Sequence, residues 1–156
     1  GDHRDLHLSI RRQRQMCIRD STYIESTAED LFEKSDERYD VVACLEVLEH
    51  VPDPKLLVKT CVELLNPGGF LFLSTINKNP RSWITAIVGA EYIFNILPKG
   101  THEFDKFIKP SVLASFVRDA DAELLETKGM FYNPITHKAN LNNDLGVNYM
   151  MYARKS

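Results

Sequence analysis

Residues 39–74, YDVVACLEVLEHVPDPKLLVKTCVELLNPGGFLFLS, contain the succession of elements from which the fold can be predicted. Tyr39–Leu45 is a near-continuous apolar run of strand length, and Phe70–Ser74 is a second one. Such runs are typical of parallel strands that are buried on both faces. With a helix predicted over residues 53–65, they form a right-handed βαβ unit. The predicted fold class is therefore α/β, with a Rossmann-like sheet.

The helix predicted between these strands has a recognisable start and end. Pro54 suits a first helical turn, and the Asn66-Pro67-Gly68-Gly69 turn follows the last helical residue. Five apolar residues are expected to form its buried face, namely Leu56, Leu57, Cys61, Leu64 and Leu65.

Shorter elements are predicted before this unit. Thr22–Ile24 is a short β-prone run, and Ser26 with Glu29 three residues later predicts the start of a short helix. A carboxylate at Glu29 would accept a hydrogen bond from an adenine amine. Ala28 and Glu29 are therefore candidate cofactor-binding residues, although an ordinary carboxylate in a first helical turn explains Glu29 equally well.

Further elements are predicted after the unit. A helix is expected from Lys109-Pro110, and two late strands are expected around 124–132 and 147–153, joined by a polar connection over 133–146. The apolar face of the helix would comprise Val112, Leu113, Phe116 and Val117.

Composition limits the class of protein. The chain has 156 residues, of which 44% are hydrophobic and 26% are charged, as expected for one globular domain. A net charge of -3 argues against a nucleic-acid-binding domain, which is normally basic. Cys44 and Cys61 stand in apolar runs without metal-site spacing, so we expect buried reduced thiols.

The first residues differ in character from the rest. Residues 1–20 contain five arginines and three aspartates and follow neither a strand period nor a helix period. The aspartates argue against a mitochondrial transit peptide. We interpret residues 1–21 as a non-native or disordered segment that looks like a translated sequencing adapter, and residues 22–156 as a partial domain.

A candidate site follows the first apolar run, at the edge where ligands bind in open α/β sheets. Glu46, Glu49 and His50 stand at i, i+3 and i+4, so a helical turn would project all three from one face. Two carboxylates and an imidazole can hold a divalent cation, although histidine is an unusual ligand for Mg²⁺. Alternatively, His50 hydrogen-bonds to the backbone and Glu49 is solvated. The residues alone leave both interpretations open.

Residues 83–97, WITAIVGAEYIFNIL, predict a helix that is apolar on most of its circumference. One interpretation is a core helix. The other is a helix that lies on a membrane surface or lines a substrate entrance, with Trp83 and Tyr92 at the interface.

Six segments between Tyr39 and the C-terminus carry a resemblance to a known family. They are YDVVACLEVLEHVPDP, LNPGGFLFLSTINKN, SWITAIVGAEYIFNILPKGTH, KFIKP, YNPIT and VNYM. They resemble the ubiquinone biosynthesis O-methyltransferases, class I enzymes that use S-adenosylmethionine (SAM) to methylate polyprenylated catechols. The first two segments occur in many class I methyltransferases, whereas VGAEYI followed by PKGTH and KFIKP is more specific.

The resemblance implies a seven-stranded mixed sheet whose last strand is antiparallel. It implies methyl transfer from SAM to a catechol oxygen of a polyprenylated ubiquinone precursor. It also implies Mg²⁺ held by the residues at Glu46, Glu49 and His50, with Leu45 in contact with SAM. A cation on the phenol oxygen would lower its pKa and orient it.

The resemblance further implies partners and a location. The apolar circumference of residues 83–97 predicts a peripheral membrane contact, and the resemblance implies that the protein joins a multi-enzyme ubiquinone-biosynthesis complex. The location would be the matrix side of the mitochondrial inner membrane in a eukaryote. In a bacterium it would be the cytoplasm or the periphery of the inner membrane.

One departure from the family is clear. The glycine-rich loop after the family's first strand and the acidic residue after its second have no counterpart, so the predicted sheet lacks its first strands. We therefore expect this chain alone to be inactive and to bind SAM weakly or not at all, which titration calorimetry would measure. Micromolar SAM affinity would contradict this expectation. The alternative function is a SAM-free, membrane-associated subunit that binds prenylated quinone precursors or partner proteins.

Overall fold

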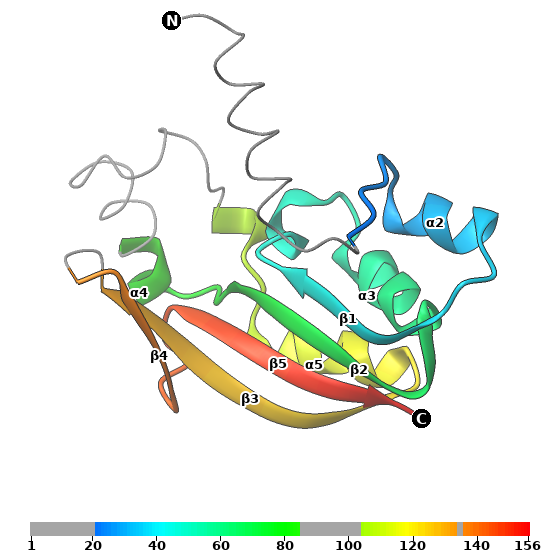
Figure 1. Cartoon of the computed structure of the whole chain (residues 1–156). Helices are drawn as coiled ribbons and strands as arrows, with labels where there is room; N and C mark the ends of the chain where they lie inside the picture. The colour runs from blue at the N-terminus through cyan, green and yellow to red at the C-terminus, as the bar shows by residue number, and fades with distance from the viewer. Residues whose placement is uncertain (1–20, 85–103, 134–135) are drawn as a thin grey trace, which may run out of the picture.

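The arrangement of strands follows from a computed structural model, which describes residues 21–84, 104–133 and 136–156. Within these residues five strands form one mixed sheet in the order β1-β2-β5-β3-β4 (Figure 1). The strands are β1 Tyr39–Leu45, β2 Leu65–Ile76, β3 Ala122–Asn133, β4 Lys138–Asn142 and β5 Asn148–Lys155. Strand β1 pairs with β2 in parallel, and all other pairs are antiparallel. This arrangement confirms the α/β class and the antiparallel last strand.

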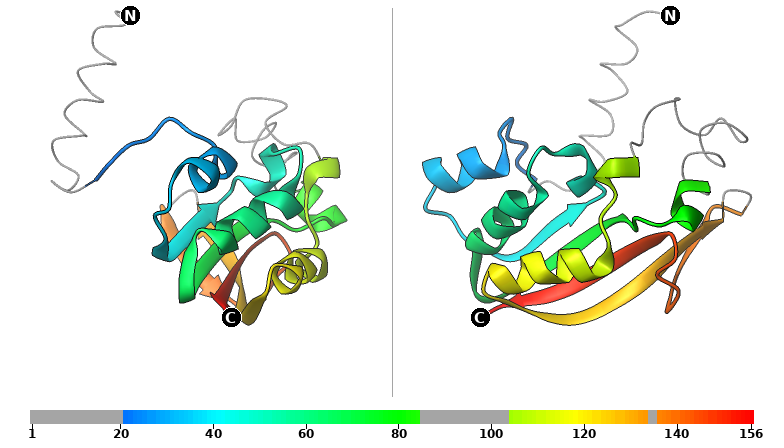
Figure 2. Two further views of the ribbon diagram at one scale, coloured as in Figure 1. Left: turned by 90° about the vertical axis from the view of Figure 1, so that its right-hand side faces the viewer. Right: turned by 180° about the vertical axis from the view of Figure 1, so that it is seen from behind.

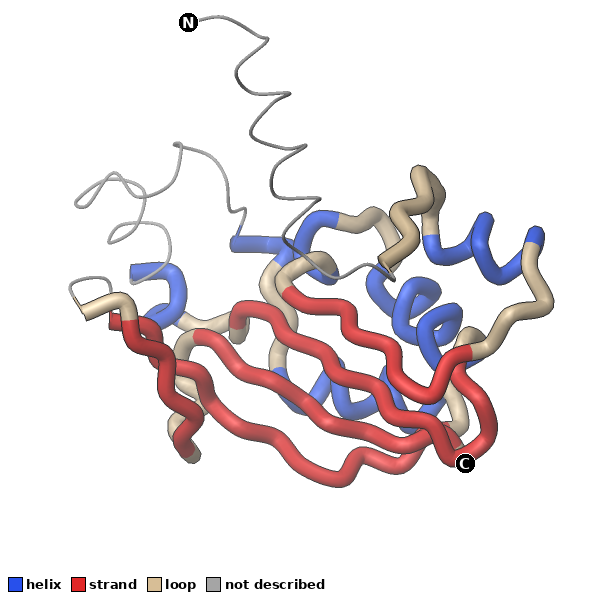
Figure 3. The backbone as a smooth tube through the Cα atoms, in the orientation of Figure 1, coloured by secondary structure: helices blue, strands red, loops and turns tan. Residues whose placement is uncertain are grey.

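The described helices leave one face of the sheet uncovered. They are α2 Ala28–Lys34, α3 Pro54–Glu63, α4 Pro80–Ser82 and α5 Pro110–Asp119, with single 3₁₀ turns η1 Leu48–His50 and η3 Phe104–Lys106. Figures 2 and 3 show α3 and α5 together on one face of the sheet and no described helix over the opposite face. None of the described helices is long and apolar enough to cross a membrane.

The predicted βαβ unit is present as β1, α3 and β2. Asp53 caps α3, because its side chain accepts a hydrogen bond from the Leu56 backbone N–H at 2.9 Å. Strand β2 begins at Leu65 rather than at Phe70. The predicted turn becomes an irregularity within the strand, because Tyr39 pairs with Leu65 whereas Val41 already pairs with Phe70. Gly68 supplies the left-handed conformation there, with φ 76°.

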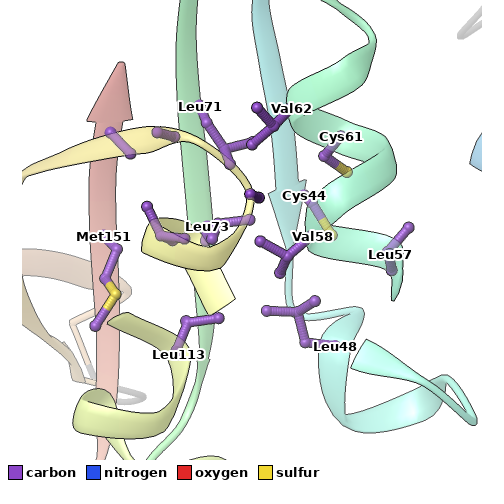
Figure 4. Packing of buried hydrophobic residues seen from close by; sticks show 14 of the residues in the cluster. Cys44, Leu48, Leu57, Val58, Cys61, Val62, Leu71, Leu73, Leu113 and Met151 are labelled. Carbon is purple, nitrogen blue, oxygen red and sulfur yellow. The ribbon is translucent and has the colours of Figure 1, made fainter. Parts of the chain in front are cut away.

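The hydrophobic core lies between the sheet and helices α3 and α5. Figure 4 shows Val58 and Val62 of α3 facing Leu71 and Leu73 of β2. Leu64 and Leu65 are buried as predicted, but Leu56 is 49% exposed. The inner face of α3 is Leu57, Val58, Cys61 and Val62, a set with the same helical period displaced from the predicted one.

The two core cysteines are free and buried, as predicted. Figure 4 shows Cys44 of β1 facing Cys61 of α3. A hydrogen bond from the Cys61 thiol lowers the pKa of Cys44, and the same bond together with burial raises the pKa of Cys61. The pair therefore belongs to the contact between β1 and α3.

Strand β1 is less buried than its sequence predicts. Val41 is 54% exposed, and in the whole strand only Cys44 is buried. Burial on both faces, which the apolar run predicts, is wrong because helices cover only one face. The position of β1 at the edge of the described sheet matches the open edge expected around Val41 when the first strands have no counterpart. On the uncovered face Phe72 stacks on Tyr152 with ring centroids 4.9 Å apart, so apolar surface is concentrated there.

Two predictions before β1 need correction. Thr22–Ile24 forms no strand, and Tyr23 and Ile24 are exposed, since no described strand lies beside them. The short helix does form, but Thr27 rather than Ser26 caps it, because Thr27 Oγ1 accepts a hydrogen bond from the Asp30 N–H at 3.1 Å.

The C-terminal elements largely match expectation. Helix α5 and both late strands are present, although Val112 of α5 is 40% exposed. The segment predicted as a polar connection contains β4, whose residues are all exposed. Because these residues are exposed, the sequence of β4 is polar and contains no apolar run from which a strand could be predicted. The helix predicted over 83–97 lies outside the described residues beyond Ile84.

Candidate active site

The candidate site begins where the chain leaves β1. Glu46 has a left-handed backbone, with φ 54°, which costs free energy in a residue with a side chain. Its N–H lies 3.1 Å from both the carbonyl oxygen and Oγ of Ser74. These contacts turn the chain at the carboxyl edge of the parallel pair, where open α/β sheets bind ligands.

The carboxylate of Glu46 is fixed by two neighbouring strands. Ser74 Oγ of β2 donates to Oε1 at 2.7 Å, and Asn148 Nδ2 of β5 lies 3.4 Å from Oε2. The residue is only half-buried. The site therefore presents an oriented carboxylate at an accessible edge of the sheet.

Glu49 lies in a different environment. It is 3% exposed, and its Oε2 accepts a hydrogen bond from Thr75 Oγ1 at 2.7 Å. Its Oε1 has no hydrogen-bond partner among the described residues. Because Ser74 and Thr75 are consecutive in β2, their side chains point to opposite faces. Glu46 and Glu49 are therefore held on opposite sides of the strand.

A buried tyrosine adjoins these carboxylates. Tyr149 pairs with Thr75 across the sheet, is fully buried and donates its hydroxyl to the Ile108 carbonyl at 2.9 Å. Burial raises the pKa of Tyr149, and the nearby charges of Glu49 and Glu46 raise it further. The phenol therefore stays protonated and structural.

The predicted metal geometry is not what the structure contains. Only Leu48–His50 forms a 3₁₀ turn, Glu46 precedes it in a left-handed conformation, and His50 is exposed whereas Glu49 is buried. The expectation that all three project from one helical face is therefore wrong. Among the described residues no group of three or more His, Cys, Asp or Glu side chains could hold a metal ion. As arranged here, these residues do not fit Mg²⁺ as one ligand set.

The candidate cofactor residues occupy two places. Leu45 is 45% exposed at the carboxyl end of β1, and an accessible apolar side chain there fits contact with a nucleoside-type cofactor. Ala28 and Glu29 open α2, and Ala28 packs against the core cluster that contains Cys44, the neighbour of Leu45. Their contacts with SAM stay predictions.

The loop before β5 is tied to the end of β2. Asn77 Nδ2 donates to the Leu145 carbonyl at 2.8 Å, and Asn79 Nδ2 donates to the Gly146 carbonyl at 3.0 Å. Arg81 pairs with Asp144 at 2.8 Å. These links fix the loop from which Asn148 reaches Glu46.

Sequence reasoning did not single out Ser74, Thr75, Asn148 or Tyr149. A signal for the first two was present, because a Ser-Thr pair ends the otherwise apolar stretch FLFLST. Polar residues at the carboxyl end of a buried parallel strand are candidates for a site. Asn148 could not be identified from the sequence because only strand pairing brings it beside Glu46.

Comparison with known proteins gives both a family and relatives. The family model described as a methyltransferase domain matches residues 8–127. The match includes part of residues 1–21, the segment interpreted from its sequence as non-native or disordered. A ubiquinone biosynthesis O-methyltransferase of Saccharophagus degradans is 54% identical over 134 residues, covering 85% of this chain and 57% of the relative. One from Pseudomonas savastanoi is 52% identical over 129 residues, covering 83% and 56%. The chain thus spans little more than half the length of these relatives.

Solved structures share the fold. A SAM-dependent methyltransferase of Thermotoga maritima matches with a TM-score of 0.61 at 20% identity, covering 96% of this chain and 68% of that one. The magnesium protoporphyrin IX methyltransferase of Synechocystis matches with a TM-score of 0.58 at 16% identity, covering 94% and 57%. At these identities the likeness concerns architecture alone.

Proposed function

Because the chain belongs to the methyltransferase domain family and has its class I α/β fold, we propose that the complete protein methylates a ubiquinone precursor. By complete protein we mean a chain of the relatives' length. The reaction would transfer a methyl group from SAM to a catechol hydroxyl of a polyprenylated precursor. The observation that carries this proposal is the similarity to ubiquinone biosynthesis O-methyltransferases over more than four-fifths of the chain.

The geometry at Glu46 gives this chemistry a proton acceptor. A phenol is a weak nucleophile at neutral pH, and a positioned carboxylate that takes its proton typically contributes about 10²–10⁴ in rate. The Glu46 carboxylate is already oriented by Ser74 and Asn148, so it would receive the catechol proton without reorganisation. SAM, when bound, supplies a methyl group activated on a sulfonium. As the phenol oxygen bonds to the methyl carbon, the carbon–sulfur bond breaks.

The proposal can be tested by incubating the complete protein with labelled SAM and a catechol that carries a short prenyl tail. We expect label in a monomethylated product, and none with the matched 1,3-dihydroxybenzene, which lacks neighbouring hydroxyls. A magnesium requirement stays a prediction, and repeating the assay with a chelator checks it. Binding of the catechol without methyl transfer would overturn the enzyme proposal and favour the SAM-free binding subunit.

A further inference from the structure

An apolar groove runs between η1, α3 and α5 on the face of the sheet that the helices cover (Figure 2). Its larger part has a volume of about 500 Å³. The apolar residues that line this part include Leu48, Val51, Pro54, Phe107, Ile108 and Val112. A second hollow of about 220 Å³ adjoins it, and Phe116 lines both. The groove therefore continues from η1 along the surface between the two helices.

The apolar and the charged residues that line the larger part of the groove differ in burial. Its buried members, Leu48, Phe107 and Ile108, are all apolar. Charged residues of the lining are exposed or already engaged. Lys78 lies 3.4 Å from Asp105, and at the far hollow Lys55 pairs with Asp119 at 2.6 Å. Such a lining suits a hydrocarbon chain, which has no hydrogen-bonding groups to satisfy, better than a peptide with its obligatory backbone donors.

The position of the groove links it to Glu46. Leu48 follows Glu46 by two residues and contributes its side chain to the groove wall. Lys78 lines the same wall just beyond the end of β2, whose Ser74 holds the Glu46 carboxylate. The Glu46 carboxylate is held by Ser74 on the opposite side of β2 from the helices, so a molecule with its polar ring at Glu46 would reach the groove around the carboxyl end of the strand.

We propose that this groove binds the first isoprene units of the substrate tail while the catechol ring lies at Glu46. The inference rests on the proposed function for its choice of occupant. Val112 is 40% exposed and lines the groove rather than packing in the core, so it would contact the tail. Each methylene that leaves water contributes about a fourfold gain in affinity. A catechol with a two-isoprene tail should therefore bind at least about ten-fold more tightly than bare catechol.

The test is a titration of the labelled 156-residue chain with these two catechols, followed by amide chemical shifts. We expect the tailed probe to shift the amides of Ile108, Val112 and Phe116. In Val112→Glu, tailed-probe affinity should fall about ten-fold or more while the affinity for bare catechol stays unchanged. A carboxylate in the first turn of α5 favours the helix, so this variant should fold.

Ser111→Glu is the matched control. It places the same charge in the same turn at an exposed residue outside the groove lining, and we expect unchanged binding of both probes. Shifts outside the groove, equal affinity of the two probes, or an unaltered Val112→Glu variant would overturn the inference. Because the titration involves no methyl transfer, its outcome is separate from that of the enzyme assay. Tail binding without catalysis would count against the proposed function alone.

Discussion

Replacing Leu73 by alanine should lower the free energy of unfolding of this chain by about 2–5 kcal/mol. Leu73 is fully buried in β2, in the core cluster that also holds Val58 of α3 and Leu113 of α5. Truncation removes its contacts and leaves a cavity that neighbouring elements fill only in part. Urea unfolding followed by circular dichroism would measure the loss.

The matched control is Leu141→Ala in β4. It deletes the same atoms from a leucine that is 61% exposed, so the expected cost is below about 1 kcal/mol. Equal costs for the two variants would show that the core does not lie between the sheet and the α3–α5 layer.

Replacing Glu46 by glutamine should lower kcat of the complete protein by about 10²-fold or more. The amide has the shape of the carboxylate but cannot take a proton, and Ser74 can still donate to its oxygen. KM for SAM should change little. Initial rates of methyl transfer at saturating SAM would measure the effect. Glu123→Gln, which neutralises an exposed carboxylate paired with Arg154 at 2.8 Å, should leave kcat unchanged.

The same variant separates a proton acceptor from a metal ligand. If raised Mg²⁺ restores the activity of Glu46→Gln, the carboxylate acts as a ligand, as the resemblance implies. If activity stays low at every Mg²⁺ concentration, the role of proton acceptor is supported. Full activity of Glu46→Gln without added metal would contradict both roles.

The fold was predictable where a single period governs the chain. The apolar runs of β1 and β2 and the helical spacing of α3 depend on local sequence, and all three elements are present. The burial of β1 was not predictable in the same way. An apolar sequence shows that a strand can be buried. Whether it is buried depends on which other segments pack against it, and none of the described segments buries Val41.

The position of Glu46 was predictable, but the geometry around it was not. Position after a parallel strand correctly put Glu46 at the carboxyl edge. The i, i+3, i+4 spacing assumed a helix, and the left-handed backbone of Glu46 displaces its side chain from Glu49 and His50. That conformation depends on hydrogen bonds to Ser74, which is 28 residues away in sequence. No local pattern encodes it.

The ion pair and the hydrogen bonds that tie the loop before β5 to the end of β2 differ in their dependence on pH. The N–H of Gly146 and then the Arg81 side chain hold the pKa of Asp144 below its ordinary value. Because the pKa of Asp144 is lower in the folded state, this link contributes its full stabilisation above the pKa of the unfolded state. The stabilisation is lost as the pH falls through the folded-state pKa. The amides of Asn77 and Asn79 do not titrate, so their bonds to the loop persist. In acid the loop would therefore loosen at its Asp144 end while the end that leads into Asn148 stays attached.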